Sequence, residues 1–344
     1  MNKSNNTFLI TGSAGFIGAA LAKKLLESGE NVVGIDNVND YYDQRLKKDR
    51  LNDIKLSINQ ENKWKFEEVS LEDQKALREV FERHKPNIVV NLAAQAGVRY
   101  SIVNPHVYIQ SNILGFHNIL DNCRKFEVDN LIYASSSSVY GGNMAVPFQE
   151  DQNISQPLSI YAATKHSNEL MAHAYSNIYK IPSIGLRFFT VYGPWGRPDM
   201  APMIFAKSII NKEPIEVFNF GKMKRDFTYI DDVVEGIYRC CYKPPNIENS
   251  FDIDDEGNKL SNAPHRIFNL GNSSSIDLIK FIELLENEIG IKAIKIFKGM
   301  QQGDLISTAA NMDKLKKWVD FAPTTNIEKG IENFIKWFKS YYGV

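Results

Sequence analysis

The sequence contains few cysteines and almost no net charge. Its three cysteines, Cys123, Cys240 and Cys241, are an odd number without the spacing of a metal cluster, so we predict reduced thiols. The six histidines do not lie at ligand spacings from these cysteines, and we predict no metal site. With 40 basic and 41 acidic residues, the chain has no overall positive field to hold nucleic acid or an anionic membrane.

Long apolar runs are also lacking. The first residues, MNKSNN, are polar, and the apolar run that follows them ends at Gly12, which is too short for a signal-peptide core. No stretch of the sequence approaches the roughly 20 apolar residues that cross a bilayer as a helix. We therefore expect no membrane partner and a cytoplasmic location.

What is present, in the first half of the chain, is a regular alternation of short apolar runs and amphipathic segments. Strands are predicted at 8–11, 31–35, 88–93, 130–134 and 183–189. Helices are predicted near 15–28, 73–84, 105–126 and 161–179. Near-continuous apolar strands that alternate with helices predict an α/β fold of the Rossmann type, with a doubly wound parallel sheet.

After about residue 190 the pattern changes, because loops become longer and rich in glycine and proline, as in GPWGRPDMAP. We predict a Rossmann domain over 1–190, with parts of about 225–270 returning to it. A smaller C-terminal α/β substrate-binding lobe is predicted mainly over 191–344. The polar stretch 244–264 is interpreted as a surface loop.

A glycine-rich turn, Gly12-Ser-Ala-Gly15-Phe-Ile-Gly18, follows the first predicted strand and opens the first helix. Such a turn lets backbone N–H groups and the helix N-terminus approach a pyrophosphate, although glycines also mark ordinary tight turns. Asp36 ends the second strand, where a carboxylate accepts the ribose hydroxyls of adenosine and repels a 2′-phosphate. The pair of features predicts a dinucleotide site that favours NAD. The neighbouring basic run 45–50 is interpreted as a solvated helix face.

Tyr161 and Lys165 are four residues apart on a predicted helix, so they share one face. A tyrosine with a pKa near 10 is a poor base at neutral pH, but a neighbouring ammonium group stabilises its phenolate. The plainer interpretation is an exposed helical pair. The position of Tyr161, 25 residues after Ser136 in a run of four serines (135–138), favours catalysis, because that run ends a strand at the ligand edge of such a sheet.

With these features, the chain resembles the extended short-chain dehydrogenase/reductase family over essentially its whole length, and within it the UDP-glucuronate 4-epimerases. The stretches that carry the resemblance occur in the expected order: IDNVNDYYD (35–43), LAAQAGVRYS (92–101), YASSSSVYGG (133–142), YAATKHSNELMAHAYS (161–176), RFFTVYGPWGRPDMA (187–201) and KMKRDFTYIDDVVEG (222–236).

The resemblance implies an isomerase that oxidises the sugar at C4, lets the 4-keto sugar turn, and returns the hydride to the other face. It assigns Tyr161 as general base and acid, Lys165 as the group that binds the nicotinamide ribose and lowers the tyrosine pKa, and Ser136 as the partner of the sugar O4. The implied NAD-binding residues are Gly12, Gly15, Phe16, Ile17, Gly18, Asp36, Asn37, Ser70, Leu71, Leu92, Ala93, Ala94, Gln95, Tyr161 and Lys165. The implied residues for a UDP-sugar are Arg99, Ser136, Ser137, Ser138, Tyr161, Thr190, Arg197, Arg225, Gln301 and Asp304.

Three small hydroxyl side chains separate this sequence from related subclasses. Sugar 4,6-dehydratases carry an Asp-Glu pair where this chain has Ser137 and Ser138, and decarboxylases carry a glutamate at the second position. Galactose epimerases carry Asn where this chain has Thr190. Hydroxyl donors at these places suit a carboxylated sugar, and our hypothesis is that they hold the carboxylate and suppress its loss as CO2.

Some positions depart from the family pattern. Ser70 stands where relatives carry an Asp that meets adenine, so a weaker acceptor is expected there. Gln302 replaces a usual Pro, Asn311 stands where Asp is common, and the loop 246–263 is longer than expected.

Two other functions are compatible with these motifs: a UDP-galactose or UDP-N-acetylhexosamine 4-epimerase, and a non-catalytic NAD(H) or nucleotide-sugar sensor. The hydroxyl side chains argue against the first, and the intact Ser136, Tyr161 and Lys165 argue against the second. In relatives, helices like those near 105–126 and 161–179 pair across a dimer as a four-helix bundle, so we expect a homodimer.

Overall fold

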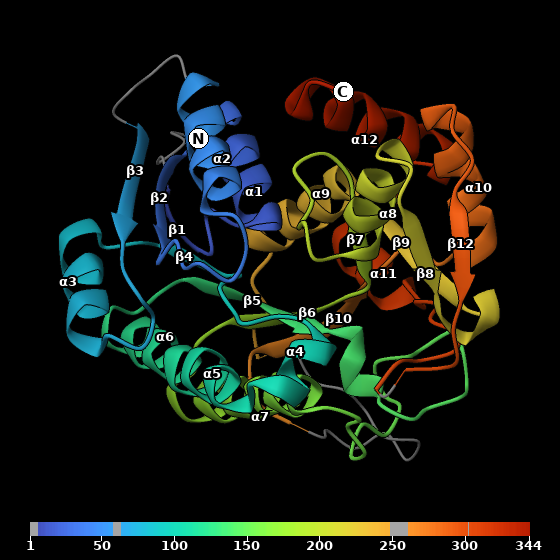
Figure 1. Ribbon diagram of the computed structural model, residues 1–344. Coiled ribbons are helices and arrows are strands. Elements are labelled where there is room, and N and C mark those ends of the chain that lie inside the picture. Colours follow the sequence, from blue (N-terminus) through green and yellow to red (C-terminus); the bar gives the residue numbers. More distant parts are fainter. Residues whose placement is uncertain (1–5, 58–62, 248–260, 302) are drawn as a thin grey trace.

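Seven parallel strands form the central sheet of the computed structural model, which describes residues 6–57, 63–247, 261–301 and 303–344 (Figure 1). The strand order is β3-β2-β1-β4-β5-β6-β10, and every neighbouring pair is parallel. The predicted doubly wound Rossmann sheet is therefore confirmed. The strands are β1 (Thr7–Thr11), β2 (Asn31–Asp36), β3 (Trp64–Glu68), β4 (Ile88–Asn91), β5 (Asn130–Ser136), β6 (Ser183–Phe188) and β10 (His265–Leu270).

Helices cover both faces of this sheet. Because successive side chains of a strand point to opposite faces, each strand contributes residues to both helix–sheet cores. Phe8 and Ile10 of β1 join the core beneath α1 (Phe16–Glu27) and α9 (Ile230–Cys241). Leu9, between them, joins the core beneath α3 (Gln74–His84), α6 (Gly115–Lys125) and α7 (Ile160–Tyr179). Because both faces are buried, the inner strands β1 and β4 are buried along almost their whole length, whereas the edge strand β3 is mostly polar.

The predicted helix 105–126 is interrupted. The structure has α4 (Val98–Val103), α5 (Pro105–Tyr108) and a π-helical turn, η2 (Ile109–Leu114), before α6. The Asn112 carbonyl accepts a hydrogen bond from Asn168 Nδ2 at 2.6 Å, and the Asn112 side chain bonds the backbone of Gln95 at 2.8 and 3.0 Å. These contacts fit a widened turn, of the kind often found at functional sites, and they tie the segment after β4 to α7.

The rest of the chain adds two small sheets beside the main one. β7 (Thr190–Tyr192), β9 (Lys224–Tyr229) and β11 (Ser275–Asp277) form the first, and β8 (Pro214–Val217) and β12 (Ile294–Phe297) form the second. Their helices are α8 (Ala201–Ile210), α10 (Leu278–Ile289), α11 (Asp313–Val319) and α12 (Ile327–Tyr342). Two late elements, α9 and β10, pack with the main sheet. The predicted domain division, with its boundary at residue 190 and its return near 225–270, stays a prediction.

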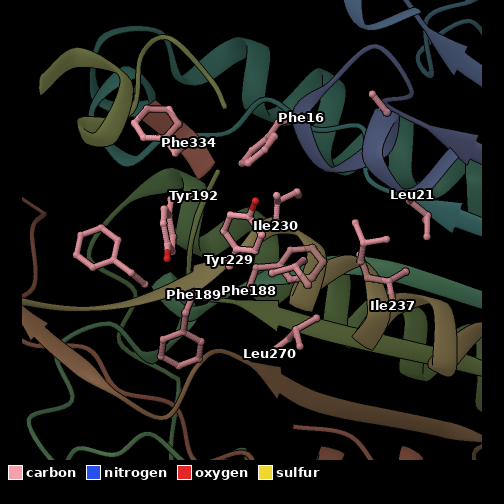
Figure 2. Close-up of a cluster of buried hydrophobic side chains, with 14 of the residues drawn as sticks. Phe16, Leu21, Phe188, Phe189, Tyr192, Tyr229, Ile230, Ile237, Leu270 and Phe334 are labelled. Carbon is pink, nitrogen blue, oxygen red and sulfur yellow. The ribbon is translucent and has the colours of Figure 1, made fainter. Parts of the chain in front are cut away.

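One continuous apolar core joins the main sheet to this second part of the chain. Figure 2 shows Phe16 and Leu21 of α1 in the same cluster as Phe188 of β6, Tyr229 of β9 and Phe334 of α12. Burying a large apolar side chain stabilises the fold by about 2 kcal/mol. The shared core therefore holds the two parts of the chain against each other.

In the part of the chain that the structure describes, no helix has the length and apolar character needed to cross a membrane.

Arg50 of α2 (Gln44–Leu56) corrects the interpretation of the basic run 45–50 as a solvated face, because its side chain is fully buried. Its guanidinium donates to Ala14 O at 3.0 Å in the glycine-rich turn, to Trp195 O at 2.7 Å, and to Tyr42 Oη at 2.6 Å. The ring of Trp195 packs on Trp337 of α12, with ring centroids 5.3 Å apart. One buried cation therefore fastens the glycine-rich turn to a loop of the second part of the chain.

We predict that Arg50→Met destabilises the protein by about 3 kcal/mol, because it leaves several buried carbonyl oxygens without donors. Thermal and urea unfolding followed by circular dichroism measure this loss. Arg45→Met on the same helix is the matched control, since Arg45 is exposed and pairs with Asp43, and it should leave the melting temperature unchanged. Equal stability of the two variants would contradict the proposed role of Arg50.

Candidate active site

The glycine-rich turn lies at the carboxyl end of β1, where α1 begins. Gly12 has φ +72°, and a Cβ there would lie 2.8 Å from Ala93 N. A Cβ on Gly18 would lie 2.1 Å from Gly12 O, so the turn and the helix pack as closely as they do only without side chains. No side chain caps the start of α1, which leaves the first N–H groups of the helix, at Phe16 and Ile17, for a ligand.

Asp36 lies beside this turn at the end of β2. Its carboxylate accepts hydrogen bonds from Ala14 N at 3.1 Å and from Val38 N at 2.9 Å. Burial raises the pKa of Asp36, and these hydrogen bonds and the charge of Lys47 oppose the rise. Lys47 Nζ itself donates to Asn39 O and Asn39 Oδ1, both at 2.7 Å, so two of its three donors are engaged within the protein.

Ser70, at the departure from the family pattern, belongs to a polar chain next to Asp36. Its Oγ donates to Glu72 Oε2 at 2.5 Å and accepts from Asn37 Nδ2 at 3.2 Å. Glu72 Oε1 in turn accepts from Ser111 Oγ at 2.7 Å. The serine thus orders the turn after β3, and its predicted contact with adenine stays a prediction.

Of the other departures from the family pattern, Asn311 lies in a turn before α11, where its Oδ1 accepts a hydrogen bond from Asp313 N at 2.9 Å. Gln302 and residues 248–260 lie outside the described residues.

The segment after β4 passes close to the glycine-rich turn. Ala93 N donates to Thr11 Oγ1 at 3.1 Å, and Leu92 N donates to Thr11 O at 3.3 Å. Gln95 is held by Asn112, as described above, and Leu71 is buried behind this segment. The structure therefore brings the predicted cofactor residues from β1, β2, β3 and β4 to one edge of the sheet.

The predicted catalytic residues meet where α7 crosses the end of β5. Lys165 Nζ is buried and donates to Ala134 O at 2.8 Å. Ser136 Oγ accepts from Ser138 N at 3.1 Å, and its hydroxyl also bonds the Tyr161 phenol. Ser136 ends β5, so a short turn, η3 (Ser137–Tyr140), begins beside the phenol.

The pKa values of Tyr161 and Lys165 are set by burial, which disfavours their charged forms, and by neighbouring groups that oppose burial. Burial raises the pKa of Tyr161, while the hydrogen bond from Ser136 and the charge of Arg197 lower it. Burial lowers the pKa of Lys165 to about 8, and the charge of Glu169 opposes that change. A tyrosine alone in this position would stay protonated at neutral pH, so its use as a base depends on the neighbouring cation.

The three predicted hydroxyl side chains lie beside the catalytic group. Ser137 and Ser138 follow Ser136 directly in η3, and Thr190 begins β7 immediately after the end of β6, the strand paired with β5. Ser137, Ser138 and Thr190 are all partly buried. Their predicted contact with a C5 substituent of the sugar stays a prediction.

A second polar group gathers residues that are far apart in the sequence. Arg99 Nη2 lies 3.3 Å from Asp304 Oδ2, and its guanidinium lies 4.9 Å from the ring centre of Phe218. Burial lowers the pKa of Arg225, with the charge of Asp304 opposing and that of Arg99 reinforcing the change. Two guanidinium groups that face one carboxylate suit a diphosphate. Gln301 is partly buried and lies three residues before Asp304.

Arg197, predicted for the nucleotide pocket, is part of a different cluster. Its guanidinium makes a two-point contact with Asp199, at 3.0 and 2.6 Å, and donates to Ala96 O at 3.4 Å. Tyr41 Oη donates to Asp199 Oδ2 at 3.1 Å. The charge of Arg197 reaches Tyr161, which places it on the catalytic side; a contact with the nucleotide stays a prediction.

Sequence reasoning missed several polar residues of the site. Tyr41 and Asp199 lie within stretches that carried the family resemblance, but nothing in those stretches shows that they meet. Glu169 and Arg187 form a buried ion pair next to Lys165, with Arg187 Nε 2.8 Å from Glu169 Oε1. The one available signal was that Glu169 lies four residues after Lys165, on the same helical face.

The residues of the first edge fit a dinucleotide: a glycine turn that packs without side chains, an uncapped helix start, and a carboxylate beside them. Among the described residues, no group of three or more His, Cys, Asp or Glu side chains could hold a metal ion. The structure thus contains a glycine turn with a nearby carboxylate, a tyrosine–lysine–serine group and a pair of arginines.

Comparison with known proteins agrees with this geometry. The family model described as the NAD dependent epimerase/dehydratase family matches residues 8–253. Protein CapI of Staphylococcus aureus is 54% identical over 336 residues, which cover 97% of this chain and 98% of that protein. A probable UDP-glucuronate 4-epimerase of Rhizobium meliloti is 43% identical, with 97% of each chain covered.

A solved structure is similar over the same length. The UDP-glucuronic acid 4-epimerase of Bacillus cereus, in complex with UDP-glucuronic acid and NAD, superposes with a TM-score of 0.85 at 31% identity. The similarity covers 98% of this chain and 100% of that one. On this evidence, the chain belongs to the NAD-dependent epimerase/dehydratase family, and it is an enzyme with the Rossmann fold of that family.

Proposed function

We propose that this enzyme converts UDP-glucuronate to UDP-galacturonate by epimerisation at C4. The observation that carries the proposal is that Tyr161 lies against Ser136 and that Ser137 and Ser138 follow Ser136 directly. Both positions carry a hydroxyl and not the carboxylate that marks dehydratases or decarboxylases. The similarity to the Rhizobium and Bacillus proteins supports the same substrate.

In the proposed reaction, Tyr161 takes the proton from the sugar O4 while Ser136 holds that oxygen by a hydrogen bond. Bound NAD accepts a hydride from C4 and returns it to the opposite face. Lys165 keeps the phenolate of Tyr161 stable in its buried position, and the same tyrosine returns the proton. Arg225 and Arg99 would hold the diphosphate about which the 4-keto sugar turns.

The test is incubation of the purified protein with UDP-glucuronate without added NAD, followed by separation of the sugar nucleotides. UDP-galacturonate should form until the two sugars reach equilibrium, with no net reduction of NAD, because each turnover returns the hydride. Tyr161→Phe should reduce the rate at least about 100-fold, since general acid–base catalysis contributes that much or more.

The same assay separates the alternatives. Turnover of UDP-galactose or a UDP-N-acetylhexosamine in preference to the uronate would replace the proposed substrate with a neutral sugar. Binding of NAD and UDP-glucuronate without any product would favour the sensor. Net accumulation of reduced nicotinamide, read by absorbance, would indicate a dehydrogenase.

We predict that the hydroxyl side chains protect the carboxylate during turnover. Oxidation at C4 creates a β-keto acid, which loses CO2 unless the carboxylate is held out of line with the ketone. Ser138→Ala combined with Thr190→Ala should therefore release more CO2 and more 4-keto pentose for each epimerisation. Ser155→Ala, an exposed serine in the loop before α7, is the control and should leave the product ratio unchanged. An unchanged ratio in the double variant would remove this role from the hydroxyls.

We also propose a homodimer formed through α7 and the helices before it. Apolar side chains lie exposed along this surface: Leu170 and Ile178 of α7 are 61% and 64% exposed, and Ile109 and Leu114 of η2 are 48% and 43% exposed. Helices of two copies that bury such stripes form a four-helix bundle.

We also propose a cytoplasmic location, which fits the three free and buried cysteines. The product would serve the synthesis of a cell-surface polysaccharide.

Leu170→Glu is expected to convert the dimer to monomers, because a buried carboxylate in an apolar interface has no partner. Light scattering coupled to size-exclusion chromatography measures the mass. Leu56→Glu, at a position of α2 that is 87% exposed, is the matched control and should keep the dimer. A monomeric wild-type protein, or a dimeric Leu170→Glu variant, would exclude this interface.

A further inference from the structure

Three side chains of α7 contact successive residues at the end of β5. Tyr161, Lys165 and Glu169 are spaced by four residues, so they form one row along the helix. Tyr161 bonds Ser136, Lys165 Nζ donates to Ala134 O at 2.8 Å, and Glu169 Oε1 accepts from Ser135 Oγ at 2.6 Å. The row therefore has a third member beyond the tyrosine and lysine, and it ends on a buried carboxylate.

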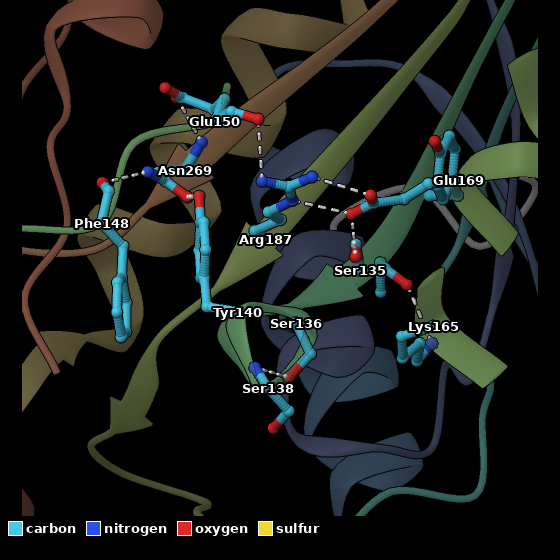
Figure 3. A network of polar contacts seen from close by, with 12 residues as sticks. Ser135, Ser136, Ser138, Tyr140, Phe148, Glu150, Lys165, Glu169, Arg187 and Asn269 are labelled. Carbon is cyan, nitrogen blue, oxygen red and sulfur yellow. Dashed lines mark hydrogen bonds and ion pairs between the residues drawn. The ribbon is translucent and has the colours of Figure 1, made fainter. Parts of the chain in front are cut away.

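Arg187 of β6 pairs with this carboxylate. Its Nε and Nη2 both lie 2.8 Å from the two oxygens of Glu169, and the side chains of both residues are only 3% exposed. Arg187 also donates to Glu150 O at 3.2 Å and lies over the ring of Tyr140, 4.9 Å from its centre. Figure 3 shows Arg187 between Glu150 on one side and Glu169 on the other, with Ser135 and Lys165 beyond Glu169.

We infer that the buried Glu169–Arg187 pair is a positioning and electrostatic element of catalysis, which places Ser136 through Ser135 and sets the protonation of the Tyr161–Lys165 pair. The inference rests on the proposed function, because it concerns the same reaction. Glu169 touches neither a reacting atom nor the cofactor edge, so it acts through its neighbours.

The positioning part follows from the strand. Neighbouring side chains of a strand point to opposite faces, so the hydroxyl of Ser135 and that of Ser136 have opposite directions. In the sheet, Ser135 is the register partner of Arg187, and Ser136 is the partner of Phe188. The short bond from Ser135 to Glu169, together with the pairing to Arg187, fixes the last residues of β5. It thereby fixes the direction in which Ser136 meets the phenol.

The electrostatic part follows from burial. Burial disfavours the ammonium of Lys165, and the charge of Glu169 opposes this effect. The bidentate contact with Arg187 gives both carboxylate oxygens of Glu169 a charged hydrogen-bond donor inside the protein. The ion pair is neutral as a whole, but its negative end faces Lys165 along α7. The nearer charge is therefore the carboxylate, which favours retention of the proton on Lys165.

Other charged or titratable groups face this cluster from each neighbouring element. Tyr133 of β5, Tyr140 of η3, Glu150 of the following loop and His265 of β10 face Glu169 or Arg187, and Tyr108 and Arg197 face Tyr161. Burial lowers the pKa of His265 to about 3 and raises that of Tyr140 to about 12, so both stay neutral near pH 7. Burial also raises the pKa of Glu150, which makes Glu150 the group to control for.

The experiment measures the pH dependence of kcat for wild type, Glu169→Gln, Arg187→Gln and the double variant. Glu169→Gln removes a negative charge and leaves Arg187 unpaired. Both changes favour loss of protons from Lys165 and Tyr161. The acidic and the basic limb of the pH profile of kcat should therefore both move to lower pH by about one unit. Arg187→Gln should move both limbs to higher pH. The double variant restores neutrality and should return the limbs close to those of wild type.

A second readout does not depend on turnover. Ionisation of Tyr161 is followed by ultraviolet difference absorbance of tyrosinate, taken between each protein and the same protein with Tyr161→Phe. Its midpoint should shift in the same direction as the limbs. Glu150→Gln is the matched control, because it removes a carboxyl on the far side of Arg187, and it should shift the midpoint by less than half as much as Glu169→Gln.

Limbs that stay in place, or that move in the same direction in both single variants, would overturn the inference, since a purely structural pair would lower kcat without moving either limb. If the single variants do not fold, Glu169→Asp and Arg187→Lys provide the test, because they keep both charges but displace Ser135. They should reduce kcat at least about 5-fold with unchanged limbs, and an unchanged kcat in both would refute the positioning role. An inactive wild-type enzyme would instead refute the proposed function.

Discussion

The packing of α7 across the end of β5 is the contact on which the site depends. Lys165 spans the gap by donating to Ala134 O, and Glu169 accepts from Ser135 one helical turn further on. Both hydrogen bonds require α7 to lie at one particular position along β5. The orientation of the Tyr161 phenol is therefore a consequence of how two elements with a buried interface are held in register.

Burial raises the pKa of Tyr161 and lowers the pKa of Lys165, and neighbouring charges oppose both changes. It disfavours both the phenolate of Tyr161 and the ammonium of Lys165, although catalysis needs them together. The charge of Glu169 opposes the effect of burial on Lys165, and the charge of Arg197 opposes its effect on Tyr161. Arg187 pairs with Glu169 through two hydrogen bonds. Under the proposed mechanism, these groups act together.

The second half of the chain contributes to the site from loops and from the small sheet that contains β7 and β9. Arg99 comes from the segment after β4, and Asp304 comes from a loop after β12, yet the two lie 3.3 Å apart. Arg50 connects the glycine-rich turn to the loop that carries Arg197, so the two halves are joined by a buried cation as well as by apolar packing. Such joints allow residues for the cofactor and for the sugar nucleotide to be placed by different segments and still meet.

The sequence by itself determined the fold class, the glycine-rich turn, Asp36, and the Ser136, Tyr161 and Lys165 group. These features depend on local periodicity and spacing, which strands and helices convert directly into shared faces and edges. It did not show that Arg50 is buried, that Asn112 widens a helical turn, or that Glu169 pairs with Arg187. Only the tertiary structure decided these points, because each depends on a partner from a distant segment, and a lone charged residue in a sequence reads as exposed until its buried partner is known.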